Sequence, residues 1–333
     1  MVALYITSLD KGTGKTAICA GLGKHLRADG KKIGYLKPNI NKNSEEVIDS
    51  DAWFIKQLFN LEESTDLICP VIGDESNPAQ EIKEVYARVS QGKDVIIIEG
   101  VYDQSIAEAL AAKVIVVESD SKKLLKAGAS RYKDLADNLL GVVLNKVPSS
   151  QVERVHSELS AQPDEARVNI LGVLPEDRTL FTLTIGELAE HIQGEILNCP
   201  EKTTELAENF MLGAMCVDPG PEYFGRKDNK VVVVRGERPD MQLAALETST
   251  KGLILSGNRT PTPDVLSRAK TKEIPIILAQ QDDTTSIVTS IEDALSKTGF
   301  HHENKLPKLT EIMEQYFNFQ AIYKELGLSS SHS

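Results

Sequence analysis

The stretch Ser8-Leu9-Asp10-Lys11-Gly12-Thr13-Gly14-Lys15-Thr16 joins a predicted strand to a predicted helix and decides the expected fold. A glycine-bearing loop at a helix N-terminus presents backbone N–H groups and the positive end of the helix dipole to phosphate oxygens. In such a loop Lys15 reaches the β- and γ-phosphates, and the Thr16 hydroxyl ligates Mg²⁺. The stretch departs from the GxxxxGK[ST] pattern because Leu9 takes the place of the first glycine. The alternative interpretation is a tight turn with a solvated lysine.

Short apolar strands alternate with amphipathic helices on the C-terminal side of this loop. Continuous apolar strands separated by helices are typical of a parallel sheet covered on both faces. The sequence therefore predicts a P-loop, doubly wound α/β domain over residues 1–180. Its strands are predicted at 3–8, 33–37, 95–98, 114–117, 139–144 and 168–174, and its helices at 15–29, 78–91, 122–138 and 151–160.

A second, smaller α/β domain is predicted over residues 181–300, followed by a C-terminal helix and a polar tail over 301–333. The aromatic stripe of that helix, at 309–326, can pack on its own domain, which we favour, or on a second copy of the chain. Helical periodicity alone does not separate the two. The smaller domain has predicted strands at 210–217, 231–234, 253–255 and 274–278, and helices at 185–193, 241–247, 264–270 and 285–296.

The net charge and composition of the chain disfavour some classes of binding partner. Lys and Arg together number 37 and Asp and Glu 49, which gives a formal net charge of −12. A field of that sign disfavours nucleic acid or a membrane surface as the main partner, so an anionic ligand needs a local binding device. No apolar run approaches the roughly 18 residues of a membrane span, and the first residues lack a signal-peptide pattern. We therefore expect a cytoplasmic protein.

Cysteine and histidine spacing gives no sign of a zinc or redox site. The cysteines lie far apart with no CxxC pair, and the histidines show no HxxxH spacing. Buried cysteine mostly behaves as a small apolar residue, so we expect reduced, structural cysteines. These cysteines are Cys19, Cys69, Cys199 and Cys216.

Four polar residues follow predicted strands, where the loops of a parallel sheet converge and a phosphate site would find its other groups. Glu99 directly follows the apolar run 95–98 and suits a metal ligand. Asp51 lies near a helix start and, taken alone, is more readily an N-cap. Lys37 either neutralises charge on a transferring phosphoryl group or is a solvated strand end. Asn145 offers an amide to a purine edge or is a turn asparagine.

In this order, these positions resemble the dethiobiotin synthetase and cobyrinic acid a,c-diamide synthase branch of P-loop proteins. The resemblance covers about residues 1–178 and implies ATP and Mg²⁺ as ligands. The matching elements are the extended P-loop at 8–16, the lysine-proline at 37–38, the metal-binding Asp51, the Glu-Gly at 99–100, the base-binding asparagine in 145–148 and the closing strand at 171–177.

The predicted site residues follow from the motif and the resemblance together. Catalytic roles are predicted for Lys15 and Lys37. Metal ligands are predicted at Thr16, Asp51 and Glu99. Nucleotide contacts are predicted at Asp10, Lys11, Gly12, Thr13, Gly14, Lys15, Thr16 and Asn145.

The second half resembles the DRTGG domain. Residues 183–190 match its opening helix, 235–240 its Gly-Asp-Arg-Pro-Asp segment, with Glu237 for the first Asp, and 253–258 its Leu-x-Leu-Thr-Gly-Gly segment, with Asn258 for the last glycine. This pair of domains resembles the N-terminal part of long phosphotransacetylases, whose catalytic domain follows it. Because the sequence ends at Ser333, we expect that domain to be absent and acetyl phosphate not to be made by this chain alone. The habits of these families imply a homodimer.

Departures from the resemblance bear on function. A dethiobiotin synthetase has a Ser-Gly segment after its lysine-proline and further glycines after its Glu-Gly, whereas this chain has Asn-Ile-Asn-Lys at 39–42 and Val-Tyr-Asp-Gln at 101–104. The nucleotide half of the site therefore matches, and the substrate half does not. Nothing after residue 180 resembles the glutaminase domain of the complete cobyrinate amidases, and neither Cys199 nor Cys216 has a catalytic setting.

Three functions remain open. The favoured one is a Mg-ATP-binding regulatory or sensor module that acts on a partner enzyme. The alternative is an ATP-dependent ligase-type enzyme that phosphorylates a carboxylate or carbamate of a small molecule, since such chemistry is mostly positioning and charge neutralisation. The third is a structural protein with a vestigial P-loop.

Overall fold

A computed structural model describes residues 1–39, 49–72, 78–135, 138–164, 167–213, 220–281 and 283–328. The chain divides into two compact units, of which the first combines Met1–Asp177 with Phe300–Ser333 and the second is Arg178–Gly299. Residues 40–42, the end of the predicted strand 210–217 together with Cys216, and the polar tail from 329 lie outside the described residues.

The first unit contains a six-stranded sheet in the order β2-β3-β1-β4-β5-β6, and every pairing in it is parallel. The sheet grows to one side of β1 through β3 and to the other through β4, so its topological switch point lies at the end of β1. Open α/β sheets bind ligands at that point, beyond the carboxyl ends of the strands. The strands are β1 Val2–Thr7, β2 Ile33–Leu36, β3 Val95–Glu99, β4 Lys113–Glu118, β5 Leu139–Val147 and β6 Ile170–Pro175.

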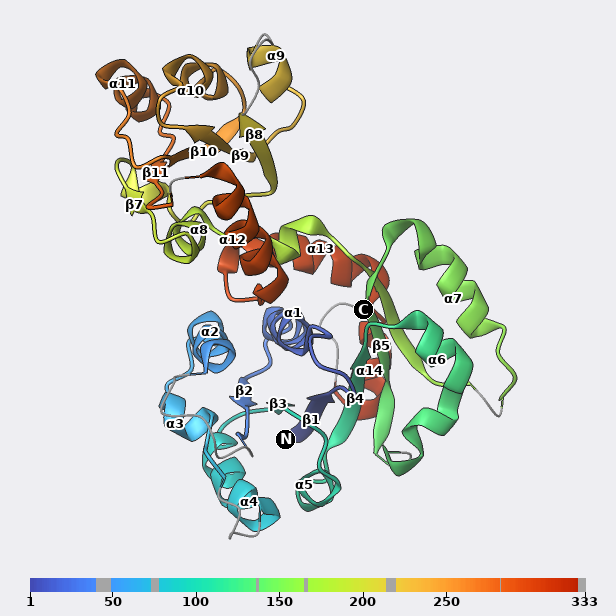
Figure 1. Ribbon diagram of the computed structural model, residues 1–333. Helices are drawn as coiled ribbons and strands as arrows, with labels where there is room; N and C mark the ends of the chain where they lie inside the picture. Colours follow the sequence, from blue (N-terminus) through green and yellow to red (C-terminus); the bar gives the residue numbers. More distant parts are fainter. Residues whose placement is uncertain are drawn as a thin grey trace. The chain divides into compact units, whose positions relative to one another are not determined.

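Helices lie on both faces of this sheet (Figure 1). Alternate strand residues such as Ala3 and Tyr5 belong to a buried cluster with side chains of α4 to α7, while α1 and α13 pack together on the opposite face. This confirms the doubly wound α/β class. The helices are α1 Lys15–Ala28, α2 Ser50–Phe59, α3 Thr65–Ile68, α4 Pro78–Val89, α5 Gln104–Ala109, α6 Ser121–Ala127, α7 Val152–Ser160, α13 Leu306–Tyr316 and α14 Phe319–Leu326, with 3₁₀ turns η1 Gly128–Leu135, η2 Ser149–Gln151 and η6 Glu303–Lys305.

The predicted helix 122–138 is interrupted. The α-helix ends at Ala127, and Gly128 takes φ +51° and ψ −144°, a combination that glycine adopts because it has no Cβ. The chain continues as the 3₁₀ turn η1, with Tyr132 outside helical dihedral angles. This break makes η1, which carries Arg131, a separate element after α6.

The C-terminal segment forms two helices, not the one that its periodicity predicts. Phe317 is extended and makes an antiparallel bridge with Gly172, and the Asn318 N–H donates to the Leu171 carbonyl over 2.7 Å. The Asn318 side chain then caps α14 by accepting a hydrogen bond from the Ala321 N–H. Pairing with β6 therefore stops the helix, and the segment packs on the first unit of its own chain.

The second unit contains a five-stranded sheet in the order β7-β11-β10-β9-β8, parallel except for the antiparallel β7. After β10, Asn258 takes φ +45°, a left-handed conformation that asparagine tolerates better than most residues. Its strands are β7 Glu195–Ile196, β8 Asn209–Gly213, β9 Lys230–Arg235, β10 Thr250–Ser256 and β11 Ile276–Leu278; its helices are α8 Ile185–His191, α9 Gly220–Phe224, α10 Pro239–Leu246, α11 Pro263–Thr271 and α12 Thr284–Lys297, with 3₁₀ turns η4 Arg178–Phe181 and η5 Pro200–Lys202.

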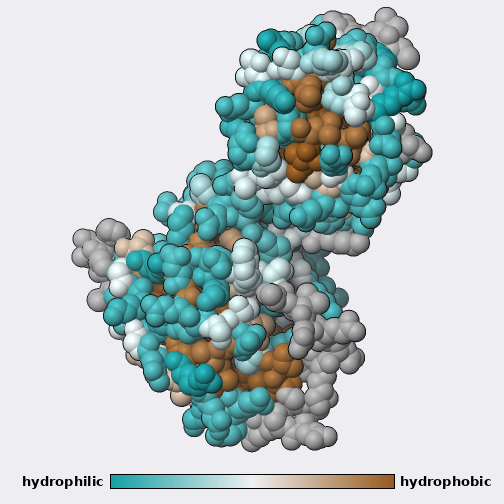
Figure 2. All heavy atoms as spheres, turned by 90° about the vertical axis from the view of Figure 1, so that its left-hand side faces the viewer, coloured by the Kyte–Doolittle hydropathy of each residue, from teal (hydrophilic) through white to brown (hydrophobic). Residues whose placement is uncertain are grey.

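The surface in Figure 2 is mostly hydrophilic and carries apolar areas on both units. Among large apolar side chains, Trp53 on α2 is 50% exposed and is the one tryptophan of the sequence. No described helix combines the length and the apolar character that crossing a bilayer requires.

Candidate functional site

The loop between β1 and α1 occupies the switch point of the first sheet. Gly14 precedes α1 with φ +92°, and no side chain caps the helix N-terminus. Within the described part of the chain, the Gly12 and Gly14 N–H groups donate no hydrogen bond. The Thr13 hydroxyl is also buried without a partner there. The loop therefore has two backbone N–H groups and one hydroxyl that can hydrogen-bond to a ligand.

Two side chains at the end of β5 hold the loop backbone from outside. Asn145 Nδ2 donates to the Thr13 carbonyl over 2.9 Å, and Lys146 Nζ donates to the Gly12 carbonyl over 2.7 Å. In a trans peptide the N–H points opposite to the preceding carbonyl. Because both carbonyls turn toward β5, the Thr13 and Gly14 N–H groups turn away from it, as a phosphate cradle requires.

Lys15 is anchored close to the loop but keeps its charge available. Its Nζ donates to Ser8 Oγ over 2.9 Å, and Ser8 Oγ donates in turn to the Asp10 carbonyl over 2.6 Å. Lys15 forms no ion pair among the described residues. An ammonium group without a carboxylate partner beside a ring of N–H groups favours an anion.

Glu99 and Thr16 meet directly behind the loop. Thr16 Oγ1 donates to Glu99 Oε1 over 2.7 Å, and the Tyr35 hydroxyl donates to Glu99 Oε2 over 2.7 Å. Glu99 is 2% exposed. Burial, assisted by the Asp51 charge, raises the pKa of Glu99, although Lys37 and the two hydroxyl donors act in the opposite direction.

Lys37 is held by carboxylates at the start of α2. Its Nζ lies 2.8 Å from Asp49 Oδ1 and 2.5 Å from Asp51 Oδ2. Burial works to lower the pKa of Lys37, but Glu99, Asp51 and Asp49 outweigh it, so its pKa is raised and the ammonium stays charged. The interpretation of Lys37 as a solvated strand end was wrong.

The N-cap interpretation of Asp51 was also wrong. Asp49 caps α2, because its Oδ1 accepts a hydrogen bond from the Ala52 N–H over 2.9 Å. Asp51 lies in the first turn instead, with its carboxylate at Lys37 and 3.2 Å from His301 Nδ1. The helix start thus carries the cap and the candidate metal ligand on separate residues.

A cavity of about 480 Å³ opens beside these groups. Lys15, Lys37, Asp51 and Glu99 all line it. Asn145 does not line it, and the Asn145 amide is hydrogen-bonded to the Thr13 carbonyl instead. Asp10 is engaged by Lys123 and Arg131, and Lys11 is exposed. The other lining residues are Pro38, Asn39, Asp49, Gly100, Val101, Tyr102 and Asp103.

The donor set suits Mg²⁺, which takes oxygen ligands and usually keeps several waters besides one or two carboxylates and substrate phosphates. Thr16 and Glu99 supply adjacent oxygens, and Asp51 a further carboxylate close enough to influence the pKa of Glu99. No group of three or more His, Cys, Asp or Glu able to hold a metal occurs in the ranges that the structure describes.

Several residues of the site were not predicted from the sequence. Tyr35 precedes Lys37 by two positions, and strand residues two apart share a face, so alternation could have found it. Asp49 immediately precedes the helix, which is the N-cap position. Lys146 and His301 carry no such signal, since only the folded chain brings them to the loop and to Asp51.

Both units are similar to known protein families. A family model described as an AAA domain matches residues 2–101, and one described as a DRTGG domain matches residues 187–294. Phosphate acetyltransferase of Nitratidesulfovibrio vulgaris is 22% identical over 95% of this chain and 50% of its own length. ATP-dependent dethiobiotin synthetase BioD of Brachyspira hyodysenteriae is 32% identical over 29% of this chain and 50% of its own length.

The chain therefore resembles the N-terminal part of long phosphotransacetylases, with a dethiobiotin synthetase-like P-loop domain followed by a DRTGG domain. It spans about half the length of the phosphate acetyltransferases that it matches. Among solved structures, the CBS and DRTGG domains of Clostridium perfringens pyrophosphatase complexed with diadenosine tetraphosphate align with a TM-score of 0.31 at 14% identity, over 55% of this chain and 73% of that one.

Proposed function

We propose that the protein binds Mg-ATP in the loop between β1 and α1 and serves as a regulatory or sensor module for a partner enzyme. The observation that carries this proposal is the loop itself. The Thr13 and Gly14 N–H groups are turned to one side by Asn145 and Lys146, and Lys15 stands beside them without an ion pair in the described chain. Both features favour a polyphosphate, because helix N-termini and loop N–H groups bind anions.

In this proposal Mg²⁺ is held by Thr16, Glu99 and Asp51 and neutralises phosphate charge. Both Glu99 oxygens already accept hydrogen bonds, from Thr16 and Tyr35, and a divalent cation beside them would further favour the charged form of this carboxylate. Lys37 keeps Asp51 close to the site through their ion pair.

The regulatory part of the proposal rests on what surrounds the nucleotide site. The segments that hold substrate in a dethiobiotin synthetase differ here, at 39–42 and 101–104. A DRTGG domain accompanies the site in this chain. We further propose that the protein acts in the cytoplasm and as a homodimer, as expected from the related families.

The test is the affinity for Mg-ATP, measured by isothermal titration calorimetry and by the fluorescence of Trp53, which lies two residues after Asp51. Lys15→Ala should weaken binding by more than about tenfold, since a hydrogen bond to a charged group contributes about 1.5–3 kcal/mol. Lys83→Ala, at an exposed lysine of α4, should bind as the wild type does. Wild-type protein without measurable binding, or Lys15→Ala with full binding, would contradict the proposal.

The ligase-type enzyme remains a second candidate because the cavity beside Lys15 has room for a small molecule. Lys37 is already paired with Asp49 and Asp51, so a substrate carboxylate would have to compete with both. ADP release that rises on addition of a metabolite pool favours this candidate. A rate that stays at its basal level with every pool eliminates it.

A further inference from the structure

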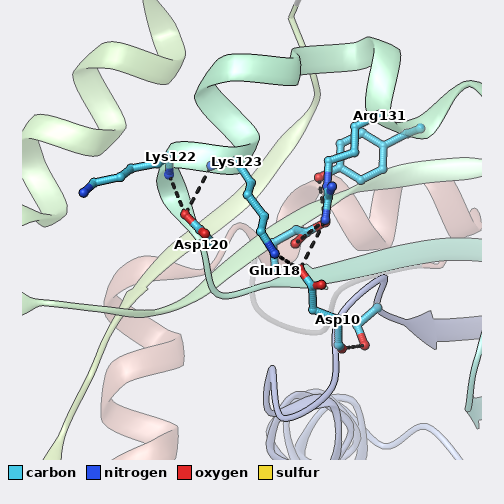
Figure 3. A network of polar contacts seen from close by, with 8 residues as sticks. Asp10, Glu118, Asp120, Lys122, Lys123 and Arg131 are labelled. Carbon is cyan, nitrogen blue, oxygen red and sulfur yellow. Dashed lines mark hydrogen bonds and ion pairs between the residues drawn. The ribbon is translucent and has the colours of Figure 1, made fainter.

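The first half of the phosphate-binding loop is fixed by cations from a distant part of the chain. Asp10 Oδ2 lies 2.9 Å from Lys123 Nζ on α6 and 3.3 Å from an Arg131 guanidinium nitrogen in η1. Lys123, followed by Arg131, lowers the pKa of Asp10, so the loop carries a fixed carboxylate at this point. Figure 3 shows Asp10 and Arg131 turned toward each other across the end of β4.

Arg131 is itself held in place from the interior. Its Nε donates to Glu118 Oε1 over 2.9 Å, and the Tyr132 hydroxyl donates to the same oxygen over 3.1 Å. The Arg131 Nη2 is shared, since it lies 3.3 Å from Asp10 Oδ2 and 3.4 Å from Glu118 Oε2. Glu118 is the last residue of β4 and 1% exposed. A buried carboxylate persists only when it is paired, so Glu118 and Arg131 fix each other. The hydrogen bond to Glu118 raises the pKa of Arg131.

The loop needs such an external hold at its start. Leu9 replaces the first glycine of the common pattern, and the two contacts from β5 reach only Gly12 and Thr13. The Asp10 carbonyl accepts from Ser8 Oγ, and Ser8 Oγ accepts from Lys15 Nζ. A shift of Asp10 would therefore move the hydroxyl that anchors Lys15.

We propose that Arg131 is a positioning residue for the nucleotide site: acting through Asp10, it fixes the first half of the loop so that Lys15 meets the phosphates. The proposal rests on the proposed function. It differs from a direct role, in which Arg131 itself would touch the nucleotide, because the positioning effect requires the Asp10 carboxylate. A double-mutant cycle separates the two, since residues that act through one contact show non-additive effects.

The experiment measures Mg-ATP affinity and thermal unfolding of the full chain for the wild type, Asp10→Asn, Arg131→Ala and the double variant. Each single variant should bind about two- to fivefold more weakly, because a partly exposed charge pair contributes up to about 1 kcal/mol. The double variant should be no weaker than the weaker single one. Arg131→Lys, which keeps the charge, should recover part of the affinity. Arg154→Ala, an exposed arginine of α7 paired with Glu158, is the matched control and should bind normally.

Additive losses would overturn the proposal in favour of direct contact between Arg131 and the nucleotide. Unchanged affinity in Arg131→Ala would overturn it outright. If Arg131→Ala fails to fold, the cycle of Asp10→Asn, Arg131→Lys and their double variant separates positioning from direct contact in the same way. If the wild-type protein does not bind Mg-ATP, both the proposed function and this inference are wrong. If it binds but the Arg131 variants bind equally well, only this inference is wrong.

Discussion

Gly14 combines two constraints that no other residue type satisfies. Its φ of +92° is strained for an L side chain, and a Cβ there would lie 2.4 Å from Asn145 Nδ2. Gly12 shares the positive φ, at +70°, but a Cβ there would meet nothing within 4 Å. A side chain at Gly12 would therefore meet backbone strain alone, whereas a side chain at Gly14 would meet the same strain and also collide with Asn145.

We predict that Gly14→Ala weakens Mg-ATP binding far more than Gly12→Ala does. Gly12→Ala should cost about 1 kcal/mol of stability, from backbone strain alone. Gly14→Ala should also push Asn145 off the Thr13 carbonyl and release the loop. Calorimetric titration together with urea unfolding measures both effects. Equal affinities in the two variants would show that the contact from Asn145 does not shape the site.

At the scale of elements, α8 begins with a reciprocal cap. Thr184 Oγ1 accepts from the Glu187 N–H over 3.2 Å, and the Glu187 carboxylate accepts from the Thr184 N–H over 2.7 Å. Thr184 is buried, so water cannot replace these hydrogen bonds. The cap fixes the point at which the second unit starts its first α-helix.

Thr184→Ala should destabilise the second unit by about 1 kcal/mol, the usual cost of losing an N-cap. Thr289→Ala, at an exposed position inside α12, should change stability by less than about 0.5 kcal/mol. Urea unfolding followed by circular dichroism provides the comparison. A loss in Thr184→Ala no larger than that in Thr289→Ala would argue against the cap as a source of stability.

Local pattern accounts for most elements of the fold, and tertiary contacts account for what it missed. The strand-loop-helix order around Lys15, the parallel strands and Glu99 at a strand end all follow from apolar runs and motif spacing. The break at Phe317 does not, because helical periodicity continues across it, and only pairing with Gly172 stops the helix. Likewise, no local sequence pattern connects Arg131 to Asp10 or Lys146 to Gly12. The residues of each pair lie far apart in the sequence, and only the folded sheet brings them together.

At the scale of the whole molecule, the first unit is discontinuous in sequence. Leu309, Ile312 and Met313 of α13 are buried in it, and Met313 approaches α1 so closely that a Cβ at Gly21 would lie 2.1 Å from its Sδ. Part of the surface of the P-loop helix α1 is thus covered by α13, which follows the second unit in the sequence.

A chain that ends at Gly299 should lose the unfolding transition of the first unit and keep that of the second. Burying each large apolar side chain contributes about 1.5–3 kcal/mol, so the three of α13 together rival the whole stability of a typical domain. Differential scanning calorimetry with and without Mg-ATP identifies the transitions, because ligand raises only that of the unit that binds it. Survival of a nucleotide-responsive transition in the shortened chain would refute this prediction.

The two parts of the first unit are synthesised at different times. Residues 178–299 separate the two parts of the first unit, and a ribosome adding about 5–20 residues per second needs about 6 to 24 seconds to make them. Throughout that interval the nascent α1 presents an apolar face whose cover has not been translated. The first unit, whose larger part is made before its neighbour, is therefore completed only after the whole of that neighbour has been synthesised.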